Sequence, residues 1–439
     1  MPRKDENSMA IQTENATPHK RNIATSILAP LQVRDFCLLL GGQMISSVGD
    51  QFYAVALPWL ILTHRGNAQE LGIVLAAYGV PRIGTLLLGG VLSDLLRPRR
   101  VMLLADIMRA LLLGILTLLV VHEQPLLWQL CLISGGLGAF TGLFLPSSFA
   151  LTPELLADDK VQAGNALNSS MMQVANLVGF TTGGIVVSAL RSTVALAVDA
   201  ISFVISAVTL ATIRGIQPSV AANHVQEGQI TGSESSTGGT SAATTDMTFR
   251  QLLQNSRLLQ VILVIGIVGN LASAGTMEVA LPALARGSLM AGASGYGLML
   301  AAFGAGALIG GLASGGLGKL PHRGLVTLLL GLVQAGAFAI IPFAGGLPGA
   351  ITALAAAGLT NGLSNVFFIS MLQQQLPRHL LGRVMGVVTF CVFGLYPLSV
   401  TLAGGITTKF GPVVMFPISG IAMAAAITFG LLQGELRNL

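Results

Sequence analysis

One short charged segment decides how this sequence is interpreted: GVLSDLLRPRR at residues 90–100. Apolar runs at roughly 70–94 and 100–121 lie on either side of it. About 20 apolar residues cross the hydrocarbon core of a bilayer as a helix, so each run is long enough to span. The segment therefore predicts a tight turn at a membrane surface, between two transmembrane helices.

The same alternation of long apolar runs and short charged segments extends over most of the chain. We predict twelve spanning helices, at roughly 36–62, 70–94, 100–121, 126–152, 162–189, 193–213, 258–285, 294–317, 323–343, 347–372, 383–408 and 412–432. The fold class expected is an all-α polytopic membrane protein.

The composition supports a surface that faces lipid. Of the 439 residues, 53% are hydrophobic and only 9% are charged, whereas a soluble domain carries roughly 25% charged residues. The 54 glycines suit close packing of helices in a bilayer. The net charge of +5 is modest and lies in short clusters, which argues against nucleic-acid binding. The three cysteines lie far apart and predict neither a metal site nor a disulfide framework.

The spans form two sets of six, separated by a polar segment. Residues 217–247 are rich in Ser, Thr and Gly and bury too little apolar surface to fold alone. We expect a tail (1–35), a six-helix bundle (36–213), a linker (214–257), a second bundle (258–432) and a short tail (433–439).

The two halves also carry a weak internal repeat. Val-Ala-Leu-Pro occurs at 55–58 in the first expected helix and again at 279–282 in the seventh. Paired bundles with a binding site between them near mid-membrane are the expected architecture for such a repeat.

Basic residues predict the orientation of the chain, because cytoplasmic loops are enriched in Lys and Arg. With a cytoplasmic N-terminus, most of the 23 basic residues fall on the cytoplasmic side. The loops on the opposite side carry only Arg65, Arg191, Arg286 and Lys409. We therefore expect a multi-pass protein of the cell membrane with both termini in the cytoplasm.

The segment at 90–100 resembles the major facilitator superfamily signature G-x-L-x-D-R-x-G-R-K, at the same place in the topology. Gly90, Leu92, Asp94 and Arg99 match it, whereas Leu95 and Pro98 stand where the signature has arginines. The stretch from Gly90 through VMLLADIMRALL is similar to the branch of drug, macrolide and siderophore exporters. The first helix (SSVGDQFYAVALPWLIL) and the entry to the eleventh (LLGRVMGV) are similar to that branch as well.

In that family the loop acts as a conformational latch, and the resemblance implies this role here. Asp94 would face the N-terminal end of the eleventh helix near Arg383, where the helix dipole favours a carboxylate. Arg99 and Arg100 would add ion pairs, although plain anchoring at the cytoplasmic surface explains Arg100 equally well. The fifth helix has GFTTGG at 179–184 where exporters often have G-P-x-x-G-G, which weakens any inference of antiport from that motif.

Two isolated acids lie inside the membrane and mark candidate sites, because a charged group at bilayer depth is costly. Asp50 lies in the middle of the first helix, and Glu278 lies in its counterpart, the seventh. Removal from water favours the protonated carboxyl, whereas a nearby cation favours the carboxylate. The two acids could therefore bind protons or attract a cationic substrate. Hydrogen bonding between helices, or pairing of Asp50 with an arginine, is the structural alternative.

Other polar residues in the spans are weaker candidates. Arg82 has no acid nearby in sequence, so it needs a partner across the bundle or a wet cavity. Asp106 and Arg109 are three residues apart on one helix face, which predicts mainly a structural ion pair. The role of Asp199 stays open. Polar side chains at helical spacing predict two faces that line a cavity, with Asn176 and Asn365 as candidates to contact substrate. Hydrogen bonding between helices explains these faces equally well. Phe52 and Tyr53 could stack on a substrate. The members of these faces are Asn165, Ser169, Met172 and Asn176, then Asn361, Asn365 and Phe368.

These features favour a secondary transporter that exports small amphipathic molecules in exchange for protons. An importer or lipid flippase on the same fold is the first alternative; an intramembrane enzyme or a membrane scaffold is an alternative of another class. An enzyme is disfavoured because all six histidines fall in predicted loops or tails. No phosphate-binding G-x-x-x-x-G-K-[ST] loop is present.

We expect no cofactor, no metal and no nucleic acid. The partners expected are a small-molecule substrate, protons and lipid; the sequence does not fix the oligomeric state, and we expect a monomer.

Overall fold

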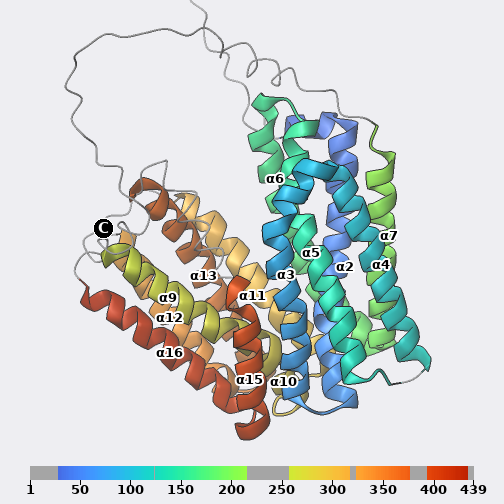
Figure 1. Ribbon diagram of the computed structural model, residues 1–439. Helices are drawn as coiled ribbons and strands as arrows, with labels where there is room; N and C mark the ends of the chain where they lie inside the picture. The colour runs from blue at the N-terminus through green and yellow to red at the C-terminus, as the bar shows by residue number, and fades with distance from the viewer. Residues whose placement is uncertain (1–27, 123, 215–256, 317–322, 376–392, 434–439) are drawn as a thin grey trace, which may run out of the picture.

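The computed structural model describes residues 28–122, 124–214, 257–316, 323–375 and 393–433. Side chains are described throughout these ranges except at 90, 91, 93, 94, 257–259, 315, 316, 323 and 371–375. The described residues are almost entirely helical, as Figure 1 shows. The predicted linker and both predicted tails lie largely outside these ranges.

The first half of the chain forms a bundle of six long helices after a short 3-10 turn, η1 (Ala29–Gln32). They are α2 (Arg34–His64), α3 (Ala68–Leu96), α4 (Pro98–His122), α5 (Leu127–Leu155), α6 (Asp158–Leu190) and α7 (Ser192–Thr212). We call these the N-terminal bundle.

The second half forms the C-terminal bundle. Its first span is built from α9 (Arg257–Gly275), the π-helical turn η3 (Thr276–Ala280) and α10 (Leu281–Arg286). The others are α11 (Gly292–Gly316), α12 (Arg323–Ile340) with η4 (Ile341–Phe343), α13 (Leu347–Gln375), α15 (Tyr396–Phe410) and α16 (Pro412–Leu432).

Eleven of the helical segments are long and apolar enough to cross a membrane, within the described residues. Each lies within a few residues of a predicted span. The predicted span at 383–408 is described only from residue 393, so its first part lies outside the described residues. The all-α polytopic fold predicted from the sequence is confirmed.

Large apolar side chains cover much of the outside of the helices. Leu87, Leu132 and Leu312 are 72%, 68% and 73% exposed. A soluble protein of this size rarely exposes so extensive an apolar surface. The exposed leucines fit a hydrocarbon environment around the bundles.

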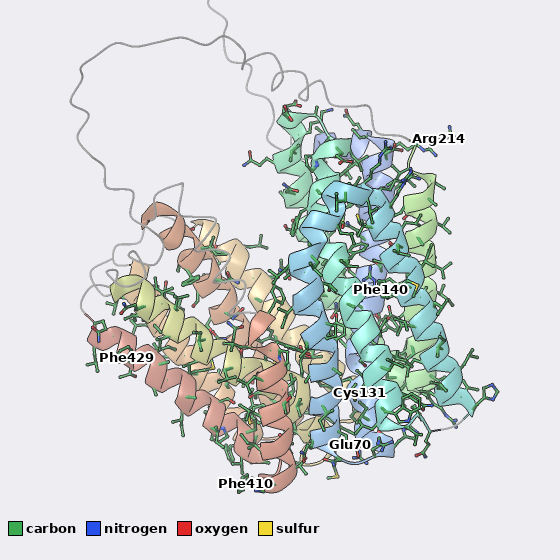
Figure 2. The ribbon with its side chains drawn as sticks, in the orientation of Figure 1. Glu70, Cys131, Phe140, Arg214, Phe410 and Phe429 are labelled. Carbon is green, nitrogen blue, oxygen red and sulfur yellow. The ribbon has the colours of Figure 1, made fainter. Side chains whose placement is uncertain are left out.

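The two bundles meet at one end and diverge toward the other (Figure 1). We call the end where α2 passes into α3 the closed end and the opposite end the splayed end. Figure 2 places Glu70 and Phe410 at the closed end and Arg214 at the splayed end. The contacts between bundles are made chiefly by α3 with α15 and by α6 with α11.

Glycines allow these two contacts to be close. A Cβ added to Gly297 of α11 would lie 2.4 Å from the carbonyl oxygen of Phe180 in α6. A Cβ added to Gly72 of α3 would lie 2.4 Å from the carbonyl oxygen of Val400 in α15. Backbone therefore packs directly on backbone at both contacts, as small residues permit in membrane helices.

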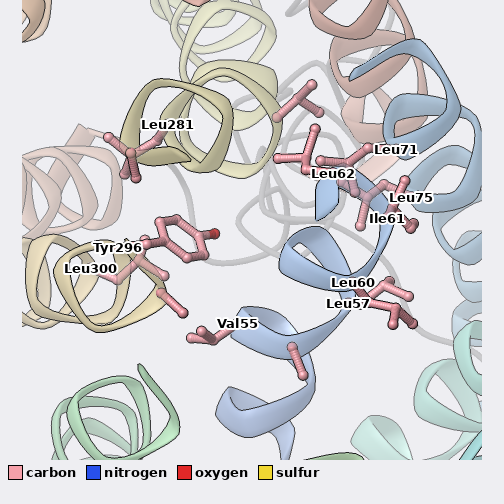
Figure 3. Close-up of a cluster of buried hydrophobic side chains, with 14 of the residues drawn as sticks. Val55, Leu57, Leu60, Ile61, Leu62, Leu71, Leu75, Leu281, Tyr296 and Leu300 are labelled. Carbon is pink, nitrogen blue, oxygen red and sulfur yellow. The ribbon is translucent and has the colours of Figure 1, made fainter. Parts of the chain in front are cut away.

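An apolar cluster that spans both bundles lies near the closed end. It includes Leu57 of α2 and Leu71 of α3 together with Leu281 of α10 and Tyr296 of α11, all at most 2% exposed. Figure 3 shows Tyr296 facing the gap toward Val55 of α2. The cluster excludes water from the space between the bundles at this end.

Hydrogen bonds join the bundles at the surface of the closed end. The Thr408 hydroxyl of α15 donates to Asn67 Oδ1 at 3.0 Å, and the Gln69 amide donates to the Thr408 hydroxyl at 2.9 Å. Asn67 is also the N-cap of α3, accepting from the same amide at 2.9 Å. A pocket of about 500 Å³ lies beside this link, lined from both bundles by residues that include Leu62, Asn67, Arg286, Ser288 and Thr408.

Candidate functional site

Glu278 lies on a π-helical turn, Thr276–Ala280, in the middle of the seventh span. The sequence suggests why the regular helix is interrupted there. Pro282 has no backbone N–H to donate to the carbonyl of Glu278, four residues earlier, and its ring would clash with that carbonyl in an α-helix. Single π turns inside α-helices occur frequently at functional sites. This turn sets the direction in which the carboxyl points.

Side chains from α15 and α16 hold this turn in place. The Tyr396 hydroxyl donates a hydrogen bond to the Glu278 carboxyl. The Ser399 hydroxyl accepts from the amide of Gly275 at 2.8 Å, and the hydroxyls of Thr276 and Ser419 lie 2.5 Å apart. The carboxyl of Glu278 is thus positioned by fixed partners within its own bundle, yet the residue stays partly exposed.

Arg82 of α3 faces Glu278 from the other bundle. The guanidinium of Arg82 is close enough to Glu278 to act on its charge. It lies over the ring of Phe393, 4.8 Å from the centroid, and over that of Tyr78, 5.7 Å away. Aromatic faces attract cations, so these rings hold Arg82 in place. The partner that the sequence left open is therefore in the opposite bundle, and the aromatic residues were not found from the sequence.

Asp50 lies halfway along α2 and is partly exposed. The guanidinium of Arg82 acts on the charge of Asp50 as well as on that of Glu278. Tyr53, one turn further along α2, has its ring centroid 6.5 Å from that of Tyr78. Its hydroxyl lies 3.1 Å from Ser134 Oγ. The structure thus brings Asp50, Tyr53, Arg82 and Glu278 into one region at the junction of the bundles.

The polar residues predicted on α6 have divided roles. Asn176 accepts a hydrogen bond from Gln51 of α2 at 3.0 Å, and the Ser47 hydroxyl donates to the sulfur of Met172 at 3.0 Å. Asn176 therefore joins helices within the N-terminal bundle, which is the alternative that the sequence left open; Gln51 was not foreseen. Asn165 and Ser169, nearer the splayed end, are exposed.

Asn365 of α13 is exposed. On α6, the face that contacts α11 near the closed end continues toward the splayed end as Ser169 and Gln173, both exposed. The polar surface on this side of the N-terminal bundle therefore faces the space into which the bundles diverge.

The predicted latch is only partly described. The surroundings of Gly90, the side chain of Asp94 and the whole of Arg383 lie outside what the structure describes. Arg99 donates to the carbonyl oxygens of Leu210 and Ala211 at the end of α7, both at 2.8 Å, and Arg100 is exposed. A cation at carbonyls that close a helix is favourable. In this state Arg99 binds its own bundle, and the latch between bundles stays a prediction for another state.

A second charged cluster lies inside the N-terminal bundle. Asp106 and Arg109 form an ion pair, and the Ser206 hydroxyl donates to Asp106 at 2.6 Å. Asp199 of α7 is 1% exposed and lies near the same arginine. The pair predicted from spacing is present, and it belongs to a larger group than the sequence indicated.

Within the described residues no cluster of His, Cys, Asp or Glu could hold a metal ion. What remains is a set of fixed, partly exposed acids and an arginine between two packed helical bundles. Such a set can bind and release protons and attract charged solutes, and together with the fold it defines a membrane transporter. The family model "Major Facilitator Superfamily" matches residues 39–399, and the chain belongs to that family.

Curated relatives of this chain are exporters. It is 25% identical over 389 residues to "Multidrug efflux pump Tap" of Mycobacterium tuberculosis, covering 85% of this chain and 87% of that protein. It is 26% identical over 400 residues to "Enterobactin exporter EntS" of Citrobacter koseri, covering 90% and 91%. The resemblance to exporters noted in the sequence is thereby confirmed at the level of the family and its relatives.

Solved structures of the same fold include the nucleoside transporter NupG, with a TM-score of 0.67, 11% identity and coverage of 91% of this chain and 98% of that one. A POT family transporter matches with a TM-score of 0.69, 11% identity and coverage of 92% and 96%. At such identities the likeness shows the fold alone.

Proposed function

We propose that this transporter exports small amphipathic compounds from the cell in exchange for protons. The observation that carries the proposal is that Arg82 acts on the charge of Asp50 in its own bundle and of Glu278 in the other. The relatives named as a multidrug efflux pump and an enterobactin exporter favour outward transport.

The proposed cycle uses the competition between protons and substrate for these groups. With the splayed end in the cytoplasm, substrate enters between the bundles and reaches Glu278 and Asp50. A cationic group on the substrate favours the carboxylate form, so its binding releases protons. Rocking of the bundles then opens the closed end, substrate leaves, and protons from outside rebind. Alternating access around a site near the midplane is the general scheme for paired bundles.

The proposal places the protein in the cell membrane with both termini in the cytoplasm. The loops at the closed end that carry Arg65, Arg191, Arg286 and Lys409 then face outward. This orientation follows the bias of basic residues toward the cytoplasm. The closed end is accordingly the outer end, and the state described here is open toward the cytoplasm.

The test is transport into everted membrane vesicles from expressing and non-expressing cells. The panel contains macrolides, tetracyclines, lipophilic cations such as ethidium, and a catechol siderophore. We expect accumulation of at least one compound in expressing vesicles only, abolished by a protonophore. Whole cells should show a matching rise in tolerance or in siderophore release.

Other outcomes would separate the alternatives. Energised uptake into right-side-out vesicles would indicate an importer, and movement of a labelled lipid between leaflets would indicate a flippase. Accumulation that persists with a protonophore but needs a sodium gradient would leave export standing and replace the proton as the coupling ion. No movement of any compound in either vesicle orientation would contradict the proposal.

A further inference from the structure

A polar stripe on α7 faces α2 and α4 inside the N-terminal bundle. Its members recur at helical spacing: Asp199, Ser202, Ser206 and Thr209. A Cβ added to Gly49 of α2 would lie 2.5 Å from Asp199 Oδ1, so this carboxyl packs against the backbone next to Asp50. Asp50 and Asp199 are therefore neighbours on adjoining helices.

The charges of this region do not balance. Arg109 of α4 is the cation of the group, and it forms its ion pair with Asp106. Asp106 is also satisfied by the Ser206 hydroxyl. The face of the guanidinium is covered by Phe144 and Phe203, 4.5 and 4.2 Å from the ring centroids. Arg109 and Asp106 thus neutralise each other. Asp50 and Asp199 are two further acids, and Arg82 of α3 acts on Asp50 but is shared with Glu278.

Asp199 lacks the partners that a buried carboxylate needs. It is 1% exposed, and its Oδ1 lies 3.3 Å from the Ser202 hydroxyl, whose single proton is shared with the backbone carbonyl of Asp199 at 2.8 Å. Its Oδ2 and the Nε of Arg109 are fully buried with no hydrogen-bond partner within the described residues. An isolated carboxylate in such surroundings is far less favourable than the neutral acid. Protonation would remove the cost of this buried charge, so the surroundings of Asp199 favour the neutral acid.

We infer that Asp199 and Asp50 form an acid pair that holds one of the exchanged protons, with Asp199 as the buried member and Asp50 as the member that reaches the space between the bundles. Two carboxyls side by side share one proton more readily than either loses it alone, because two negative charges repel at short range. Asp50 is partly exposed, so it can pass the proton to water or to substrate.

The groups that face Asp199 come from each helix packed against α7. α2 contributes Asp50 and Tyr53, and α4 contributes Asp106 and Arg109. The ionisable residues of α6 all lie in its first turn at the splayed end, whereas Asp199 lies in the second turn of α7 from the closed end. From α3, Arg82 acts on Asp50 and also on Glu278, which lies on the substrate side. The inference rests on the proposed proton exchange for its role, but the presence of the bound proton does not.

The test uses infrared spectra of the purified full chain in lipid nanodiscs, recorded over a range of pH without any substrate. A protonated carboxyl in apolar surroundings gives a C=O stretching band that carboxylates lack. We expect this band at neutral pH in the native protein, with loss of one carboxyl's intensity in Asp199→Asn. Asp50→Asn should move the remaining band in frequency, because it replaces the neighbouring carboxyl. Asp158→Asn, an exposed acid in the first turn of α6, is the matched control and should leave the band unchanged.

Ser202→Ala guards against failure of Asp199→Asn to fold, because it removes the hydroxyl beside the carboxyl and preserves the acid. It should shift the band in frequency without loss of intensity. A band unaffected by Asp199→Asn and by Ser202→Ala would overturn the inference. Since no substrate or gradient is present, failure of export in vesicles and failure of the acid pair are separate results.

Discussion

Glu278 is the residue whose role is best defined by its surroundings: a π turn orients it, Tyr396 donates to it, and Arg82 faces it from the other bundle. Its carboxyl can exchange a proton, whereas the amide of Glu278→Gln cannot. We expect this variant to lose proton-driven accumulation in everted vesicles by at least about tenfold, which corresponds to about 1.4 kcal/mol.

Counterflow of unlabelled against labelled compound needs no proton gradient and should survive in Glu278→Gln. Tyr396→Phe, which retains the carboxyl, is the control and should keep its response to a protonophore. Full gradient-driven transport by Glu278→Gln would remove this residue from the coupling mechanism.

Arg82 allows a second prediction, because its planar guanidinium lies over two aromatic rings and acts on two acids. Lysine keeps the charge but loses the planar contact. Arg82→Gln should abolish transport in everted vesicles, and Arg82→Lys should reduce it by an intermediate amount. Native activity in both variants would show that neither the charge nor the planar contact matters.

For individual residues, the sequence indicated the charged groups but not their partners. Asp50, Arg82 and Glu278 could be selected because isolated charges in apolar helices are unfavourable unless they have a use. Phe393 and Tyr396 looked like ordinary apolar helix residues, and nothing local signals a contact that exists only when distant helices pack. Asn176 was proposed for substrate but bonds to Gln51, since an amide satisfies either role equally well from sequence alone.

The π turn is an element whose cause can be tested. Pro282→Ala restores the N–H that bonds the Glu278 carbonyl in a regular helix, so the turn should revert toward α-helix and rotate the carboxyl away from Tyr396. We expect transport to fall severalfold with no loss of thermal stability. Pro58→Ala, at the matching place of the repeat in α2, is the control. There the helix is continuous, and transport should be retained.

The contacts of Gly72 and Gly297 join the helices of the two bundles toward the closed end. Gly297→Ala places a Cβ against the backbone carbonyl of Phe180, so the α6–α11 contact must open. We expect transport to be lost and a cysteine introduced at Ser288 to react faster with a membrane-impermeant maleimide. Gly304→Ala, on the same helix with open space around its added Cβ, should behave like the native protein. Unchanged reactivity in Gly297→Ala would contradict a closing role for this contact.

Helix positions were predictable because about 20 apolar residues are needed to span a bilayer, and charged segments punctuate these runs. Local departures from the regular α-helix were harder to predict. The π turn follows from a single proline, yet Pro58 in the matching position leaves α2 a single α-helix. The packing around each proline decides between a π turn and a continuous α-helix. This packing cannot be predicted from either segment alone.

For the whole molecule, the rocking of two bundles predicts that a link across the closed end stops transport. Asn67 and Thr408 are hydrogen-bonded across the bundles, so cysteines at both positions should be joined by a short thiol cross-linker. In a background without the native cysteines, cross-linking should abolish transport, and a reducible linker should allow recovery. Each single cysteine is the control; transport by the cross-linked protein would contradict alternating access at this end.

The paired architecture was visible in the repeat and in the distribution of basic residues. Which end is closed was not, because the proposed alternating access requires states closed at either end. Contacts such as Gly72 with Val400 belong to the state closed at this end, and contacts of the predicted latch would belong to the other. A sequence records both sets without distinguishing them.

The pocket beside Asn67 and Thr408 has a pharmacological consequence, because its walls come from both bundles. A ligand bound there fits only while the two walls are together. It therefore favours the closed conformation by as much as it binds that conformation more tightly than the open one. If the pocket faces the exterior, such a ligand would stop transport without crossing the membrane. Raising the intracellular concentration of exported compound would not displace it, so inhibition would be non-competitive.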